Sequence, residues 1–208
     1  MTVKHIYLAS DSPRRLKLLK EILSGRFRVI RHLHNEDSGI KEPAKHVRMN
    51  ALGKALTASK KVKNGIVIGA DTIVVSSGKI LGKPGTAVKA AKMLRAISGR
   101  KITVLTGIAV IDSVTGKRSA GVETTKLLVK KLAAGDIDRY VRTGEPMDKA
   151  GAFGIQGKGR AIIESMSGDY SNVVGLPQAR LAAILLKYGV RIKFRIPDNK
   201  RKKGRRTS

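Results

Sequence analysis

Residues 66–75 read Ile-Val-Ile-Gly-Ala-Asp-Thr-Ile-Val-Val and form the clearest strand pattern in the chain. A nearly continuous apolar run of this length, rich in β-branched residues, predicts a strand that is buried on both faces. It contains one carboxylate, Asp71, and a buried charge is costly unless it is paired, bound to a cation or exposed at a bulge or strand end. Gly69 could provide such an irregularity. Asp71 is therefore the most informative single residue for function.

The N-terminal residues predict a strand, a turn and the start of a helix. Residues 4–9 are a β-prone run, and Ser12 as N-cap with Pro13 at the first helical position marks a helix start. Arg14 and Arg15 then lie in the first helical turn, where positive charge is unfavourable unless an anion binds there. This helix N-terminus is therefore an anion site in outline.

The rest of the chain alternates between strand-like and helix-like patterns, which favours an α/β fold. No internal repeat or Gly/Ser linker divides residues 1–196, so we expect one domain, or two closely associated lobes, over this range. Further helices are predicted at residues 45–60, 86–99, 136–142 and 176–188, and further strands at 79–83, 102–111, 124–129 and 161–166.

The composition excludes several classes of protein. Hydrophobic residues make up 41% of the 208 residues, enough for a core, and the absence of Cys excludes disulfides, Cys nucleophiles and thiolate metal sites. No apolar run approaches the roughly 20 residues of a membrane span, and the first residues are too short for a secretory signal. We expect a cytoplasmic protein with no membrane partner.

The chain is strongly basic, with 43 Lys and Arg against 15 Asp and Glu and a formal net charge of +28. Polyanions are the natural electrostatic partners of such a chain. Residues 197–208 are apolar only at Pro197 and predict a basic disordered tail, either a solvated extension or an arm for non-specific nucleic-acid binding. Four Tyr and three Phe are few for stacking on bases, which disfavours nucleic-acid binding as the main function.

Several common catalytic motifs are absent from the sequence. There is no His-Glu-x-x-His, Gly-x-Ser-x-Gly, Walker A or dinucleotide fingerprint. His32 and His34 are alternate residues near a possible strand end and make a poor candidate for a metal site. Residues 154–159 are Gly-rich, but their spacing is equally typical of an ordinary turn.

Cations at turns and helix caps, together with a few unusually placed acids, remain as candidates for chemistry. Phosphate chemistry needs this mixture, because it depends on positioning and on neutralising charge with Arg, Lys and a divalent metal, while a carboxylate holds the metal or accepts a proton. The candidate cations are Arg14, Arg15, Lys54, Lys83 and Lys149, and the candidate carboxylates are Glu36 and Asp71.

Six blocks of sequence, in order over residues 4–188, resemble the Maf family of nucleoside triphosphate pyrophosphatases. The resemblance implies an elongated mixed sheet flanked by helices, of the inosine-triphosphatase-like type, with two lobes and a central cleft. It also implies hydrolysis of a nucleoside triphosphate to the monophosphate and pyrophosphate, a divalent metal cofactor (Mg or Mn) and a homodimer. The blocks are residues 8–15, 69–72, 78–84, 140–151, 154–157 and 172–177.

The resemblance also assigns roles to individual residues. Asp71 matches the catalytic acidic position, as a base or a metal carboxylate. Glu36 matches a second metal carboxylate, although the family usually has an Asp-Glu pair there and Asp37 could be the equivalent. The residues that match substrate-binding positions at the phosphates are Ser10, Arg14, Arg15, Lys54 and Lys83.

Arg15, Thr72 and Gln156 resemble the branch of the family that acts on dTTP and UTP, and not the branch that acts on 7-methyl-GTP. A Gln side chain can satisfy both a donor and an acceptor on a base edge, which suits uracil or thymine. The sequence therefore predicts a pyrimidine-directed pyrophosphatase. The alternatives are a nucleic-acid or ribosome-associated binding protein and a purine-directed, ITP-type triphosphatase on the same fold.

Overall fold

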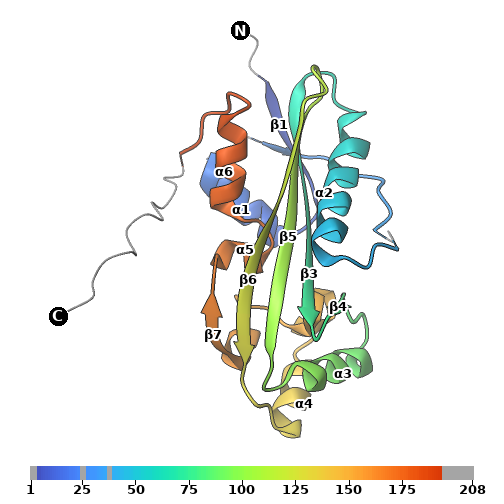
Figure 1. The fold of residues 1–208 in the computed structure, drawn as a ribbon, viewed down its shortest axis with the longest axis vertical. Helices are drawn as coiled ribbons and strands as arrows, with labels where there is room; N and C mark the ends of the chain where they lie inside the picture. The colour runs from blue at the N-terminus through green and yellow to red at the C-terminus, as the bar shows by residue number, and fades with distance from the viewer. Residues whose placement is uncertain (1–3, 24–26, 37–38, 194–208) are drawn as a thin grey trace, which may run out of the picture.

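One mixed sheet of seven strands runs along the molecule in the computed structural model, which describes residues 4–23, 27–36 and 39–193 (Figure 1). The strands are β1 (His5–Ala9), β2 (Arg28–Val29), β3 (Gly65–Ser76), β4 (Lys79–Leu81), β5 (Lys101–Asp112), β6 (Arg118–Val129) and β7 (Ile163–Ser167). Their order is β2-β1-β3-β5-β6-β7, and β4 pairs with β3. β1 is parallel to β2 and β3, whereas all other pairs are antiparallel. The predicted α/β class with a mixed sheet is confirmed.

Helices flank both faces and the lower end of the sheet (Figure 1). The α-helices are α1 (Pro13–Leu23), α2 (Pro43–Ser59), α3 (Ala87–Ile97), α4 (Ala134–Arg142), α5 (Tyr170–Val174) and α6 (Gln178–Leu186). The 3-10 helices are η1 (Glu145–Asp148), η2 (Ala150–Ala152) and η3 (Lys158–Ile162). Within the described ranges, no helix is long and apolar enough to cross a membrane.

The helix α2 lies directly on one face of β3 and β5, because two glycines admit its backbone. A Cβ on Gly69 would lie 2.2 Å from the carbonyl oxygen of Ala51, and a Cβ on Gly107 would lie 2.2 Å from that of Val47. Pairing between β3 and β5 is continuous from Ile66 to Val75. The prediction that Gly69 marks an irregularity is therefore wrong, and its physical role is to let a helix approach.

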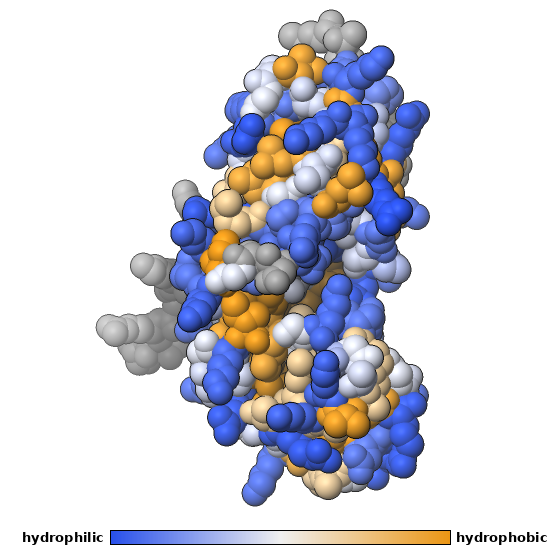
Figure 2. Space-filling view, turned by 90° about the vertical axis from the view of Figure 1, so that its right-hand side faces the viewer, coloured by the Kyte–Doolittle hydropathy of each residue, from blue (hydrophilic) through white to orange (hydrophobic). Residues whose placement is uncertain are grey.

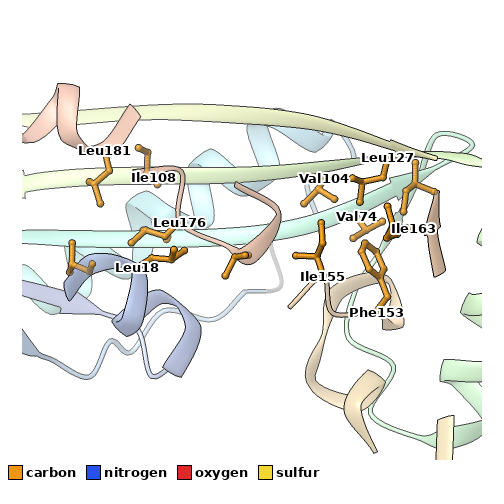
Figure 3. Packing of buried hydrophobic residues seen from close by; sticks show 14 of the residues in the cluster. Leu18, Val74, Val104, Ile108, Leu127, Phe153, Ile155, Ile163, Leu176 and Leu181 are labelled. Atoms are coloured by element: carbon orange, nitrogen blue, oxygen red, sulfur yellow. The ribbon is translucent and has the colours of Figure 1, made fainter. Parts of the chain in front are cut away.

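The opposite face of the sheet carries the larger core, which extends along most of its length (Figure 3). Leu18, Leu176 and Leu181 pack there near one end. Toward the other end, Phe153 and Ile155 point at the sheet near Val74 and Val104 (Figure 3). On the face seen in Figure 2, hydrophilic residues cover most of both halves of the molecule, and the apolar areas between them are smaller.

The edge of β3 is open in its middle. On this side β1 pairs with residues 65–69 of β3, and β4 pairs only with residues 74–76. Residues 70–73 therefore lie between two lobes that share β3, β5 and β6 (Figure 1). One lobe carries β1, β2, α1, α2 and α6, and the other carries β4, β7, α3 and α4 (Figure 1).

The predicted elements are present, with several corrected boundaries. The strand predicted at 124–129 begins earlier, at Arg118, and the strand predicted at 161–166 begins at Ile163 because a 3-10 helix precedes it. The helix predicted at 176–188 is shorter, Gln178–Leu186, because Pro177 precedes its first residue, and the separate α5 was not predicted. The predicted tail at 197–208 lies outside the described residues.

Candidate active site

A cavity of about 700 Å³ lies at the open edge of β3 and is lined by both lobes. Because successive residues of a strand point to opposite faces, an open edge lets side chains from both faces reach the same space. Eight of the predicted site residues line it: Ser10, Arg14, Arg15, Glu36, Lys54, Thr72, Lys83 and Gln156. The candidate Lys149 lines it as well. The structure thus brings residues from distant parts of the sequence to one place.

Arg15 is held by neutral oxygens from three segments of the chain. Its Nε donates to the carbonyl of Gly175 at 2.8 Å, and its two terminal nitrogens donate to Ser10 Oγ at 3.2 Å and Thr72 Oγ1 at 3.0 Å. Thr72 Oγ1 in turn lies 3.0 Å from Thr106 Oγ1. These contacts fix the guanidinium without an acidic partner, so its charge is available to an anion in the cavity.

Arg14 reaches across the cavity to the other lobe. Its Nη1 lies 3.1 Å from Asp148 Oδ2, and Lys149 Nζ lies 2.6 Å from Asp148 Oδ1. Asp148 thus places a negative charge beside Arg14 at the start of α1, where an anion was predicted. An anionic ligand here would compete with a carboxylate that is largely exposed.

Asp71 lies on the α2 face of β3, and Lys54 and Asn50 of α2 hold its carboxylate. Lys54 Nζ is 2.7 Å from Asp71 Oδ1, and Asn50 Nδ2 donates to Asp71 Oδ2 at 3.1 Å. Lys54 Nζ is also 2.6 Å from Glu36 Oε1. One buried ammonium therefore joins both predicted carboxylates.

The environment keeps both carboxylates ionised. Burial by itself would raise the pKa of Asp71, but the charge and hydrogen bond of Lys54, aided by Arg15 and Asn50, lower it overall. Burial also acts to raise the pKa of Glu36, and Lys54 outweighs this, so that this pKa is lowered too. Both groups are therefore negative at neutral pH.

The pairing with Lys54 corrects one inference from the sequence. Asp71 is only 6% exposed, and it lies behind Lys54 without bordering the cavity itself. Because an ammonium and an amide satisfy the carboxylate, its burial does not by itself require a metal ion.

The donor set fits a hard divalent cation that is shared with a substrate. Within the described residues, no cluster of three or more His, Cys, Asp or Glu side chains could enclose a metal. Glu36 and Asp71 nevertheless lie close enough together for one ammonium, that of Lys54, to contact both, and Mg²⁺ is typically held by one or two carboxylates together with water and substrate phosphates. The alternative equivalent Asp37 lies outside the described residues.

The opposite wall of the cavity is the turn that carries Gln156. Gln156 is exposed at the cavity, whereas its neighbours Phe153 and Ile155 are 5% and 6% exposed and anchor the turn in the core. Residues 154–159 are therefore not an ordinary surface turn.

Three groups in or beside the cavity were not predicted, namely Asn50, Asp148 and Glu145. Asn50 could have been found, because it precedes Lys54 by one helical turn and so shares its face.

His34, a poor metal candidate, lies with Nε2 3.1 Å from Asn50 Oδ1. His32 lines the cavity, and burial followed by the charge of Lys54 lowers its pKa.

The protein belongs to a class of α/β proteins suited to phosphorylated ligands, because its mixed sheet has a cleft of cations and carboxylates at an open strand edge. Residues 5–188 match the family model described as Maf-like protein, and the chain belongs to this family. The predicted resemblance is confirmed.

Two relatives and one solved structure illustrate the similarity. The chain is 43% identical to a dTTP/UTP pyrophosphatase of Methanosarcina barkeri over 91% of this chain and 97% of that protein. It is 45% identical to a dTTP/UTP pyrophosphatase of Pelotomaculum thermopropionicum over 91% of this chain and all 100% of that protein. The Ham1 protein of Staphylococcus aureus matches with a TM-score of 0.51 and 16% identity over 89% of this chain and 100% of that chain, which supports the fold alone.

Proposed function

We propose that this protein hydrolyses dTTP and UTP to the nucleoside monophosphate and pyrophosphate, and so removes such nucleotides from the pool. The main supporting observation is that two arginines, three lysines and the carboxylate of Glu36 line one cavity, with Asp71 directly behind Lys54. The names and the high coverage of the similar proteins support the same activity.

In this proposal the cations grip the triphosphate. Ser10, Arg14 and Arg15 surround the start of α1, and Lys54 and Lys83 flank the phosphates from the other sides. Because charge spreads over the phosphoryl oxygens in the transition state, fixed cations placed at these oxygens lower the barrier. Lys149, which is paired with Asp148, adds a further cation. When a phosphate takes the place of the Asp148 carboxylate, Lys149 contacts the phosphate instead.

Asp71 is the proposed catalytic carboxylate. Its lowered pKa keeps it ionised but makes it a weak base, because general bases work best with a pKa near the operating pH. This favours its use in orienting the attacking water and holding a metal. Glu36 and Asp71 would hold Mg or Mn, which would supply charge neutralisation at the phosphates.

Thr72 and Gln156 are the proposed specificity residues. Thr72 acts through Arg15, to which it is hydrogen-bonded. Gln156 offers one donor and one acceptor at the opposite wall, which matches the edge of uracil or thymine.

Pyrophosphate detection over a panel of canonical and modified triphosphates, including ITP, tests the proposal. We expect dTTP and UTP to be the best substrates, with equal amounts of monophosphate and pyrophosphate and with dependence on a divalent metal. Preference for ITP would favour the purine-directed alternative. Release of orthophosphate alone, or no turnover of any nucleotide, would overturn the proposed reaction.

A further inference from the structure

Glu145 is a carboxylate of η1 whose oxygens are committed to the turn that carries Gln156. Its Oε2 accepts a hydrogen bond from the backbone N–H of Lys158 at 2.8 Å. Its Oε1 accepts from the backbone N–H of Gly159 at 3.1 Å and from the hydroxyl of Tyr140 at 2.9 Å. Three donors therefore converge on one side chain.

Tyr140 connects the same carboxylate to the other end of the turn. The backbone N–H of Gly154 donates to Tyr140 Oη at 3.0 Å, while that hydroxyl donates to Glu145. Both ends of residues 154–159 are thus tied to one phenol–carboxylate pair. Gln156 lies in the middle of the segment that this pair closes.

The turn wraps tightly around the carboxylate. A Cβ on Gly157 would lie 2.4 Å from Glu145 Oε2, so any larger residue at this position would displace the carboxylate. Burial acts to raise the pKa of Glu145, but the amides of Gly159 and Lys158 and the Tyr140 hydroxyl outweigh it and lower this pKa. The acceptor is therefore ionised, and hydrogen bonds to an ionised acceptor are about twice as strong as neutral ones.

We propose that Glu145, supported by Tyr140, is a positioning residue that sets base selectivity by holding the 154–159 turn in the shape that presents Gln156 to the cavity. This inference rests on the proposed function. Glu145 acts on the base through the turn, and it needs no contact with the reacting phosphate.

The main test is Glu145→Gln, assayed with UTP and with ITP. An amide has one acceptor oxygen, so the N–H of Lys158 or Gly159 would face another donor and the turn would loosen. We expect the ratio of kcat/KM for UTP over ITP to fall about tenfold, because hydrogen bonds to charged groups are strong. Tyr140→Phe removes the link to Gly154 and one of the three donors to Glu145. It should lower the ratio in the same direction by a smaller factor, because the backbone amides of Lys158 and Gly159 still bind the carboxylate.

A double-mutant cycle separates positioning from general destabilisation. In a Gln156→Ala background, adding Glu145→Gln should change the UTP/ITP ratio no further, because the two residues act as one unit. Asp112→Asn is the matched control, since Asp112 also accepts two backbone N–H groups, from Val114 and Thr115, but lies outside the cavity. It should lower stability and leave the ratio unchanged.

Amide hydrogen exchange of residues 154–159 gives a readout that does not depend on turnover. Glu145→Gln should speed exchange in this turn and not in β5. An unchanged UTP/ITP ratio in folded Glu145→Gln and Tyr140→Phe proteins, or unchanged exchange in the turn, would overturn the inference. If the wild-type protein hydrolysed no nucleotide, the proposed function would fail instead, and exchange together with the binding affinities for UTP and ITP would still decide the role of Glu145.

Discussion

Lys54 is the residue on which the charge balance of the site depends. Its buried ammonium contacts Asp71, Glu36 and, at 3.4 Å, the carbonyl of Ala70 at the open edge of β3. A buried charge pair is tolerated only when its remaining hydrogen bonds are satisfied, and Asn50 supplies one for Asp71. The carboxylates are consequently fixed before any ligand binds, which is the preorganisation that catalysis at phosphates needs.

The substitution Gln156→Glu tests the role of the amide in base selection. A carboxylate cannot donate to a carbonyl of uracil or thymine, so Gln156→Glu should lower kcat/KM for dTTP and UTP by about tenfold or more relative to purine triphosphates. Pyrophosphate release over a nucleotide panel measures this. Lys158→Gln, an exposed neighbour in the same turn, is the control, and an unchanged base profile in Gln156→Glu would contradict the assignment.

Asp112 provides a prediction about pH and stability away from the site. Burial acts to raise its pKa, but Lys4 and the amides of Val114 and Thr115 lower it to about 2 from 3.8. A carboxylate whose pKa is lowered by folding stabilises the fold at pH values above its pKa in the unfolded chain. This stabilisation is lost as the pH falls toward its pKa in the folded protein. The free energy of unfolding of the wild type should therefore exceed that of Asp112→Asn by about 1–2 kcal/mol at neutral pH.

The difference in unfolding free energy between wild type and Asp112→Asn should shrink as pH falls from about 4 to about 2, with both values set by the two pKa limits. Urea denaturation at neutral pH and at pH values through this interval measures it. A difference that stayed constant over the whole range would show that the carboxylate charge is not the source of the stability.

At the scale of residues, the sequence predicts which side chains form the site, but not all of their contacts. Residue types and motif order identified eight side chains that share one cavity. The contacts of Lys54 and Asn50 with Asp71 were not predicted. Helical spacing places these two residues on one face of a helix, but it does not say which strand that face covers. The link from Glu145 to the Gln156 turn depends on backbone amides, which carry no signature in side-chain chemistry.

At the scale of elements, the close approach of α2 to β3 can be tested directly. Gly69→Ala would put a Cβ 2.2 Å from the Ala51 carbonyl and 2.9 Å from the Ala55 nitrogen, and these are backbone atoms that cannot turn away. We expect a loss of about 3 kcal/mol in unfolding free energy, at the upper end of typical overpacking. Gly135→Ala in α4, where the nearest atom is the end of Arg139 at 3.8 Å, should be neutral or stabilising.

Chemical denaturation of the Gly69→Ala and Gly135→Ala proteins gives both values. Equal stability of Gly69→Ala and wild type would mean that α2 can move outward without cost. Such a result would also weaken the link between this helix and the placement of Lys54.

The elements that the sequence missed share a physical cause. The first half of β6 is partly exposed and polar, so its strand state comes from pairing with β5 and not from its own apolar pattern. The five-residue α5 ends at Gly175, which has a φ of +118°, and Pro177 then precedes α6. The apolar run across this break resembles one helix, and only the turn geometry divides it.

At the scale of the whole molecule, the cleft follows from the register of the strands. β1 ends and β4 begins at different points along β3, and this gap opens the sheet edge between the lobes. The fold class could be predicted from alternating patterns, but register could not, because it depends on contacts between distant segments. The homodimer and the metal remain predictions.

The basic C-terminal residues should be separable from hydrolysis. Among the residues that the structure describes, those that line the cavity lie between residues 10 and 175, and we expect removal of residues 197–208 to leave kcat/KM for UTP unchanged within about twofold. Retention on RNA at low salt should weaken, because phosphate contacts by Lys and Arg are salt-dependent. Loss of hydrolysis in the shortened protein would show that the tail is not dispensable.

The most direct measurement is the production of monophosphate and pyrophosphate from UTP by wild type and by Asp71→Asn, with the fold of each checked by circular dichroism. Asparagine keeps the shape but removes the charge that Lys54 and a metal would share. Wild type should yield both products in equal amounts, and Asp71→Asn should be slower by on the order of a hundredfold or more. Pyrophosphate release by Asp71→Asn at the wild-type rate would contradict the assignment of this cleft as the active site built around Asp71.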